Sequence, residues 1–229
     1  MPSRKTMRSQ NTGTRTDCTL ILLGLCGVLS PVFLVVATTV GGALRPGYDP
    51  VANSISELYE IGAPNAPWLM VLLTTYHALV IPLAIGIHCG LPRRQYGWIG
   101  PFFLGMAGLF GIPLGAYARC DPGCFGATSF RGQLHGILVL VTVLLIFAAM
   151  VSIWLRTRSD PSWRSYARYT LGTAIAGIAF GTLMVPFIQG QYSGLLERIS
   201  VTIILQWYAM TGLRLIRAHR THRCAKDFR

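Results

Sequence analysis

Acidic side chains and histidines are scarce in this chain, so their positions are the first guide to any chemistry. Eight aspartates and glutamates occur in 229 residues. Five of them lie in or beside the first, third and fifth of the polar segments that separate six long apolar runs: Asp49, Glu57, Glu60, Asp121 and Glu197. His135 and Glu197 each stand near the start of an apolar run. An imidazole near several carboxylates, partly shielded from water, is suited to general acid/base catalysis.

We therefore take five residues as candidate catalytic groups: His135, Glu197, Asp121, Glu57 and Asp49. A purely structural alternative stands beside this hypothesis. Arg131 and Arg198 lie near the same acids, and pairing with them would lock the loops over the helix ends. Ser54 and Glu57 also match a capping box, in which each side chain bonds the backbone amide of the other. Capping leaves four residues without a structural reason: Tyr48, Asp49, Ser56 and Glu60.

A second group of polar residues lies deeper in the apolar runs. His77 stands about nine residues after Trp68, near mid-membrane at a rise of about 1.5 Å per residue. Arg198, Thr202 and Gln206 recur every four residues and form a helical stripe that reaches a similar depth. Such residues most commonly hydrogen-bond between helices, and a ligand cavity is the functional alternative. The candidate ligand-binding residues are His77, Gln206, Arg131, Arg198, Tyr48, Tyr76 and Tyr208.

Cys120 and Cys124 are the one pair among the six cysteines whose spacing suggests a joint role. A disulfide, two free thiols, or mixed metal ligation with Asp121 and His135 are the alternatives. The spacing is not a recognised zinc signature, so we assign no metal ligand. The chain also lacks a nucleotide-binding loop, a Gly-x-Ser-x-Gly elbow and a His-Glu-x-x-His motif. Any cofactor is therefore unidentified at this point.

The elements that must position these residues are membrane helices. The chain is 52% hydrophobic and only 12% charged, with a mean hydropathy of +0.49, which is too apolar for a soluble domain. Six runs are long enough to cross a hydrocarbon core of about 30 Å: 19–39, 68–91, 98–118, 132–155, 169–188 and 195–216. We predict an all-α membrane domain over 18–216, a disordered basic tail at 1–17 and a second basic tail at 217–229.

Glycines recur at helical spacing in two of the runs. The third run has Gly105, Gly108, Gly111 and Gly115, and the fifth has Gly177 and Gly181. Small residues on one stripe let a neighbouring helix approach closely in lipid. Both stripes are therefore predicted to be packing faces.

The distribution of basic residues predicts the orientation. Sixteen of the 20 lysines and arginines fall in the two tails and in the second and fourth connections, against four at the other side. By the positive-inside rule, the chain forms three helical hairpins in the plasma membrane with both termini in the cytoplasm. The rule also accounts for the net charge of +12 without nucleic acid, which we exclude as a partner. The basic end of the chain is expected to lie against anionic lipid head groups.

Several motifs in order resemble a known family. Tyr48-Asp49-Pro50, Ile55-Ser56-Glu57-Leu58, Asp121-Pro122-Gly123 and Gly132-x-x-His135 are similar to the pattern of domain-of-unknown-function family nine-nine-eight. The resemblance covers about residues 20–215 and implies a six-helix membrane bundle, with no established activity. The cysteine pair does not resemble part of that pattern.

Three functional hypotheses follow. The first is an acid/base membrane enzyme, such as an isoprenoid cyclase or a lipid-modifying enzyme, whose site at the outer face binds a lipidic or prenyl-type molecule. The second is a small-molecule carrier that uses His77 and Gln206 near mid-membrane. The third is a membrane subunit without a site of its own. The expected partners are membrane lipids and a lipidic or amphipathic small molecule.

Overall fold

Helices make up the whole regular structure of the part of the chain that is described. The computed structural model describes residues 4–124, 126–187 and 190–227, and side chains within residues 19–218 of these. Its long helices are α1 (Arg4–Leu44), α2 (Ala66–Gly90), α3 (Ile99–Ala116), α4 (Phe130–Thr157), α5 (Arg164–Met184) and α6 (Ser193–Asp227). Two short 3-10 helices, η1 (Ser56–Tyr59) and η2 (Val185–Phe187), lie in the connections.

Each long helix contains a segment that is long and apolar enough to span a membrane. These segments are Thr19–Leu44, Ala66–Gly90, Ile99–Ala116, Phe130–Thr157, Arg164–Phe187 and Ser193–Ala218. The predicted all-α, six-helix membrane protein is therefore confirmed. The proposed tails at 1–17 and 217–229 stay predictions, because the side chains of these residues lie almost entirely outside the described part.

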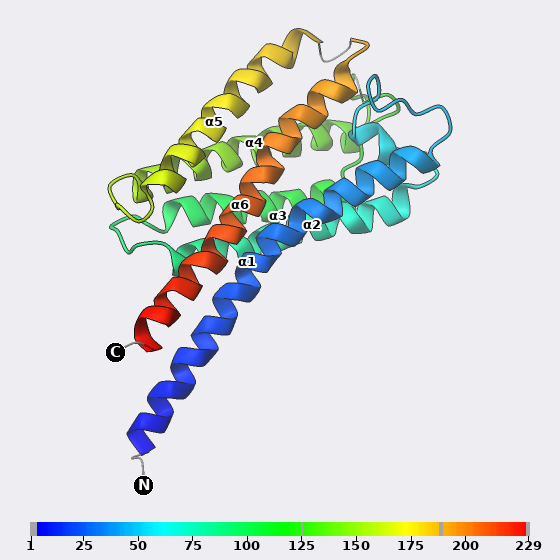
Figure 1. The fold of residues 1–229 in the computed structure, drawn as a ribbon. Coiled ribbons are helices and arrows are strands. Elements are labelled where there is room, and N and C mark those ends of the chain that lie inside the picture. Colours follow the sequence, from blue (N-terminus) through cyan, green and yellow to red (C-terminus); the bar gives the residue numbers. More distant parts are fainter. Residues whose placement is uncertain (1–3, 125, 188–189, 228–229) are drawn as a thin grey trace.

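The helices pack in chain order around a shared core. Each contacts the next, while α6 also contacts α1 and α2, so the last helix closes the bundle against the first (Figure 1). Trp207 and Tyr208 of α6 and Leu69 and Leu83 of α2 are among the core side chains that are almost fully buried. The two faces of α6 consequently look toward different neighbours, α5 on one side and α1 on the other.

The glycine stripe of α3 lets α2 approach closely. A β-carbon added at Gly108 would lie 3.0 Å from the His77 carbonyl oxygen, and one at Gly115 would lie 2.7 Å from the Thr74 nitrogen. A β-carbon at Gly111 would overlap the His77 ring. The predicted packing face of the third run is confirmed.

The glycines of α5 behave differently. A β-carbon at Gly177 would lie 2.7 Å from the Phe147 ring of α4, but one at Gly181 would meet nothing within 4 Å. The prediction that both glycines pack closely is therefore wrong for Gly181. The reason is that α5 is the least buried of the six spans, and a cavity separates its Gly181 end from α4 and α6.

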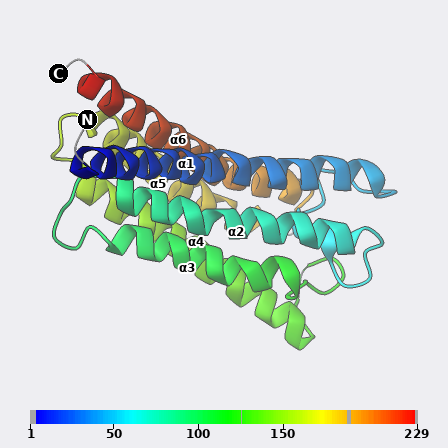
Figure 2. The same ribbon diagram turned by 90° about the horizontal axis from the view of Figure 1, so that it is seen from below.

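The connections divide between the two ends of the bundle. The loops after α1, α3 and α5 lie at one end, while the start of α1, the end of α6 and the other two connections lie at the opposite end (Figures 1 and 2). We call the first the loop end. The side of the membrane that it faces is a prediction from charge.

Candidate functional site

The loop after α1 is held by its own polar side chains. Glu57 accepts hydrogen bonds from the backbone N–H of Ser54 at 2.7 Å and from Asn53 Nδ2 at 2.8 Å. The Ser54 hydroxyl in turn accepts from the Glu57 amide at 3.2 Å. This is the predicted capping box, and it engages both carboxylate oxygens. Glu57 is therefore placed to start η1 rather than to exchange a proton with a ligand.

Asp49 is also used within the loop. Its side chain accepts from the Val51 amide at 2.9 Å, and its own amide donates to Asn53 Oδ1 at 2.9 Å. Asp49 is exposed and forms an Asx turn of the kind common in loops. The structure does not bring it to the other candidate catalytic residues.

Asp121 organises the start of α4. Its carboxylate accepts from the amides of Thr128 at 2.7 Å and Ser129 at 2.9 Å, and from the Ser129 hydroxyl. The hydrogen bonds from Ser129, followed by those from Thr128, lower the pKa of Asp121 to about 2. Ser129 then caps α4 by accepting from the Gly132 amide at 3.0 Å. Asp121 is therefore an ionised anchor for this cap.

The first two connections at the loop end are tied together. Glu60 accepts from Arg45 at 2.6 Å and from the Gly123 amide at 2.6 Å. Cys120 and Cys124 form a disulfide, which resolves the three alternatives for this pair. In the part of the chain that is described, no group of three or more His, Cys, Asp or Glu residues is arranged to hold a metal ion.

His135 and Glu197 line one cavity, although they come from different helices. This cavity, which we call the lateral cavity, has a volume of about 500 Å³ and lies between α4, α5, α6 and the loop before η1. Its polar residues gather at the loop end: Ser54, Ser56, His135, Ser193, Glu197 and Ser200. Its remaining wall is mainly apolar and includes Val139, Leu140, Val143, Phe147, Met184 and Ile204.

Backbone contacts fix one atom of each ionisable group. His135 Nδ1 lies 2.9 Å from the carbonyl oxygen of Ala118. A carbonyl can only accept, so Nδ1 carries the proton, and Nε2 of the neutral ring is left as the proton acceptor. Glu197 Oε2 accepts from the Ile55 amide at 2.6 Å. Among the described residues, Glu197 has no ion-pair partner.

This arrangement can hold an amphipathic molecule and move a proton. An apolar wall would take a hydrocarbon chain, and the histidine, the carboxylate and the serine hydroxyls would face the polar end. The volume falls within the range of about 300–1,000 Å³ that is usual for small-molecule sites. A histidine and a carboxyl group that line one cavity are residue types that general acid/base catalysis uses.

Comparison with known proteins gives a family but no activity. The family model described as "Protein of unknown function (DUF998)" matches residues 28–214. The chain belongs to the DUF998 family. This confirms the resemblance inferred from the motifs of the connections. No curated protein and no solved structure matches the chain.

In this DUF998 protein, four of the candidate ligand-binding residues do not line the lateral cavity: His77, Gln206, Tyr76 and Tyr208. Tyr76 and Tyr208 are buried with ring centroids 6.3 Å apart, and His77 packs over Gly111 of α3. Gln206 is exposed and accepts a hydrogen bond from Tyr169 of α5. A single cavity formed by these four side chains is therefore not supported.

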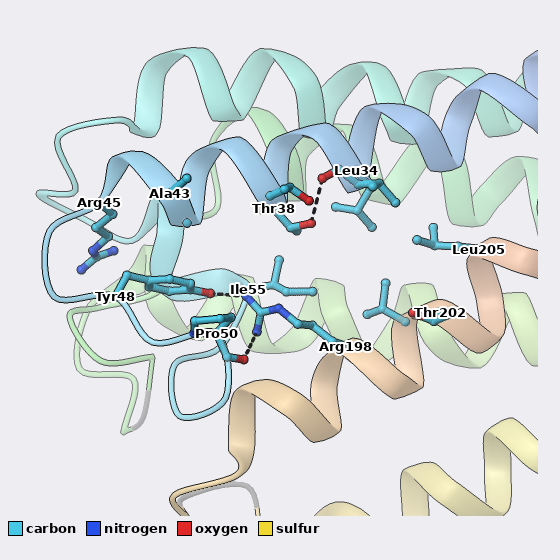
Figure 3. Close-up of a pocket in the computed structure, with 14 residues that line it drawn as sticks. Leu34, Thr38, Ala43, Arg45, Tyr48, Pro50, Ile55, Arg198, Thr202 and Leu205 are labelled. Carbon is cyan, nitrogen blue, oxygen red and sulfur yellow. Dashed lines mark hydrogen bonds between the residues drawn. The ribbon is translucent and has the colours of Figure 1, made fainter.

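The two candidate arginines at the loop end have separate surroundings. Arg131 lies over the Tyr117 ring, 4.5 Å from its centroid. Arg198 donates to the carbonyls of Pro50 at 2.8 Å and Asn53 at 3.0 Å, and to the Tyr48 hydroxyl (Figure 3). Neither arginine forms an ion pair with an acid in the described part of the chain. Arg198 does lock a loop over a helix end, but through neutral acceptors.

Several residues that line the lateral cavity were not among the candidates. Ser193 and Ser200 follow no motif, and Gly181 was interpreted as a packing residue. The spacing of Ser193, Glu197 and Ser200 on one helix face is the signal that was available, since residues three and four apart are neighbours on a helix. No periodicity showed that α5 stands away from that face.

Proposed function

We propose that the protein binds one lipidic or prenyl-type molecule in the lateral cavity and transforms it by acid/base chemistry. The observation that carries this proposal is that His135 and Glu197 line the same largely apolar cavity, each with one atom fixed by a backbone group. The hydrocarbon part would lie between α4, α5 and α6, and the polar part at the serines.

The two groups are suited to opposite directions of proton transfer. Protonated Glu197 gives a proton to the ligand, and the unprotonated Nε2 of His135 removes one from another atom of it. Such a pair of steps isomerises or cyclises a molecule without changing its composition, so it needs no redox partner. The Phe147 ring lines the same cavity and would stabilise a cationic intermediate.

Filling the lateral cavity tests the binding step. Gly181 lines it and has open space around its β-carbon position, whereas Gly172 lies on the same helix with equal space but outside the cavity. Gly181→Leu should abolish copurification of a specific lipid, as measured by mass spectrometry of extracts from the detergent-purified protein. Gly172→Leu is the matched control and should retain it. Equal lipid recovery from both variants would rule out the lateral cavity as the site.

Replacing the acid tests the chemical step. Glu197→Gln keeps an acceptor for the Ile55 amide but cannot give a proton. We expect this variant to copurify with an untransformed lipid whose structure differs from the lipid found with the native protein. His135→Gln should have the same effect. If all three proteins carry the same lipid in the same amount, the protein binds a lipid without acid/base chemistry.

Glu197→Leu separates the structural contribution of this residue. Leucine leaves the Ile55 amide without its acceptor, which costs about 1–3 kcal/mol. Glu197→Leu should therefore lower the Tm, while Glu197→Gln should leave it close to the native value. A similar loss of Tm in both variants would mean that glutamine does not replace the carboxylate as the acceptor for the Ile55 amide.

A further inference from the structure

A second cavity lies on the opposite side of α6. It has a volume of about 630 Å³ and is enclosed by α1, α6 and the loop that follows α1. Figure 3 shows Leu34 and Thr38 of α1 facing Thr202 and Leu205 of α6, with Arg198 and Tyr48 at the loop end. We call it the α1–α6 cavity.

The α1–α6 cavity is distinct from the lateral cavity. Glu197 and Arg198 are neighbours in sequence, about 100° apart around α6, and each lines a different cavity. Successive residues of the loop also face different cavities, because Ile55 lines the α1–α6 cavity while Ser54 and Ser56 line the lateral cavity. The loop and α6, whose Val201 lines both cavities, therefore form the wall between them.

The charge that lines the α1–α6 cavity is positive. Arg45 and Arg198 both line it, and no aspartate or glutamate does so among the described residues. Arg45 is neutralised by Glu60 at 2.6 Å. Arg198 has only uncharged acceptors, namely three backbone carbonyls and the Tyr48 hydroxyl. The site therefore carries an unbalanced guanidinium charge.

Arg198 also keeps donors for a ligand. Its Nη1 donates to the carbonyls of Pro50, Asn53 and Gly194, and its Nη2 donates to the Tyr48 hydroxyl. Within the described part, Nε–H and the second N–H of Nη2 have no acceptor. A guanidinium presents such N–H groups as a planar fork that matches a phosphate.

Burial raises the pKa of the Tyr48 hydroxyl, against the opposing effect of Arg198. That hydroxyl therefore stays protonated and donates to the Ser54 carbonyl at 2.8 Å.

The other half of the cavity is apolar and lies at membrane depth. Leu34 and Val35 of α1 and Val201 and Leu205 of α6 line it. Arg198 is five residues into the span that begins at Ser193, or about 7.5 Å at 1.5 Å per residue. A cation near the polar boundary of the membrane, with an apolar cleft below it, complements a phospholipid, whose phosphate lies above its acyl chains.

We propose that the α1–α6 cavity binds an anionic membrane phospholipid, with its phosphate on Arg198 and an acyl chain between α1 and α6. Thr38, Thr39 and Thr202 also line the cavity. A free phosphate would leave the apolar half unused, so the lipid is the favoured source of the anion. This site is separate from the site of the proposed reaction.

The test uses the full chain in neutral detergent and titrates it with phosphatidylglycerol, phosphatidylcholine, diacylglycerol or inorganic phosphate. Native mass spectrometry counts bound lipid, and Tm reports stabilisation. We expect phosphatidylglycerol to bind at least about tenfold more tightly than diacylglycerol, because charge-assisted hydrogen bonds are the stronger ones. Arg198→Gln should remove this preference, and Arg131→Gln, at the same end but outside the cavity, should keep it.

A second variant keeps the proposal testable if Arg198→Gln does not fold. Thr202→Phe fills the cavity from an exposed position, and Met210→Phe is a matched exposed control on α6 outside it. Thr202→Phe should weaken phosphatidylglycerol binding, and Met210→Phe should not. Equal binding of phosphatidylglycerol and diacylglycerol, or saturation by inorganic phosphate alone, would overturn the proposal.

Discussion

At the scale of single residues, the acids of the loop end that hold structure differ from Glu197, the acid of the proposed reaction. Glu57 has both oxygens engaged by its own loop, and Asp121 accepts from neighbours at the start of α4. Glu197 is different, because its one backbone contact comes from the distant Ile55 and it lines a cavity. The number of local donors, rather than the presence of charge, distinguishes the two classes.

The pH dependence of the loop before α4 tests the role of Asp121. Its folded pKa of about 2 lies below the model-compound value of 3.8. Ionised Asp121 therefore stabilises the folded loop fully above about pH 4, and this contribution is lost as the pH falls toward 2. We expect the protection of the amides of residues 128–132, taken relative to the intrinsic exchange rate at each pH, to fall over that interval.

Asp121→Asn is the comparison for this experiment. Asparagine can still accept hydrogen bonds but does not titrate, so in Asp121→Asn this protection should be lower at neutral pH and nearly independent of pH below 4. If the native and Asp121→Asn proteins show the same profile, the carboxylate does not anchor the cap.

At the scale of elements, the sequence predicts the position of a residue along its helix better than it predicts which neighbouring helix the residue faces. The six spans followed from the length of the apolar runs. His135 and Glu197 stand near the starts of two runs that begin at the same end of the bundle, which is why they line one cavity. The stripe through Arg198, Thr202 and Gln206 was less informative. Each step of four residues advances about 400°, so Gln206 has drifted by about 80° and faces Tyr169 of α5.

Arg156, near the end of α4, has a structural role that its position in the sequence does not predict. Its basic type was interpreted as part of a cytoplasmic charge cluster, yet it is only 8% exposed. Its guanidinium donates to the carbonyls of His88, Leu91, Pro92 and Gly97. Nothing in the local sequence shows that the connection between α2 and α3 folds onto α4.

Arg156→Met should therefore destabilise the bundle. Methionine fills part of the volume but leaves several carbonyls without donors, at a cost of about 2 kcal/mol or more. We expect a clear fall in Tm in detergent. Arg158→Met is the control, since Arg158 is exposed and lies over the Trp154 ring. A similar Tm for both variants would show that Arg156 does not hold the connection.

The α2–α3 interface gives a second test at this scale. Gly111→Ala places a methyl group in the His77 ring, whereas Gly105→Ala places one 3.9 Å from the Ala84 β-carbon, an ordinary contact. Overpacking costs about 1–3 kcal/mol, so Gly111→Ala should lower Tm and Gly105→Ala should not. Equal stability of the two would mean that α2 and α3 pack more loosely than described.

At the scale of the whole molecule, both cavities carry their charged residues at the loop end, and the two ends of the protein differ in charge. The loop end carries five of the eight acids but only four of the 20 basic residues. The other end carries the basic excess, which the cytoplasmic side of a membrane retains. The lipids available to both cavities therefore depend on which leaflet the loop end faces.

Labelling of single cysteines in the full chain determines that orientation. Val51→Cys stands in the exposed loop after α1, and Ser159→Cys in the exposed connection between α4 and α5. The background keeps the Cys120–Cys124 disulfide and replaces the other four cysteines by serine. In intact cells, a membrane-impermeant maleimide should label Val51→Cys and not Ser159→Cys, while both should react after lysis. The reverse pattern would place the loop end in the cytoplasm, and the ligands of both cavities would then come from the inner leaflet.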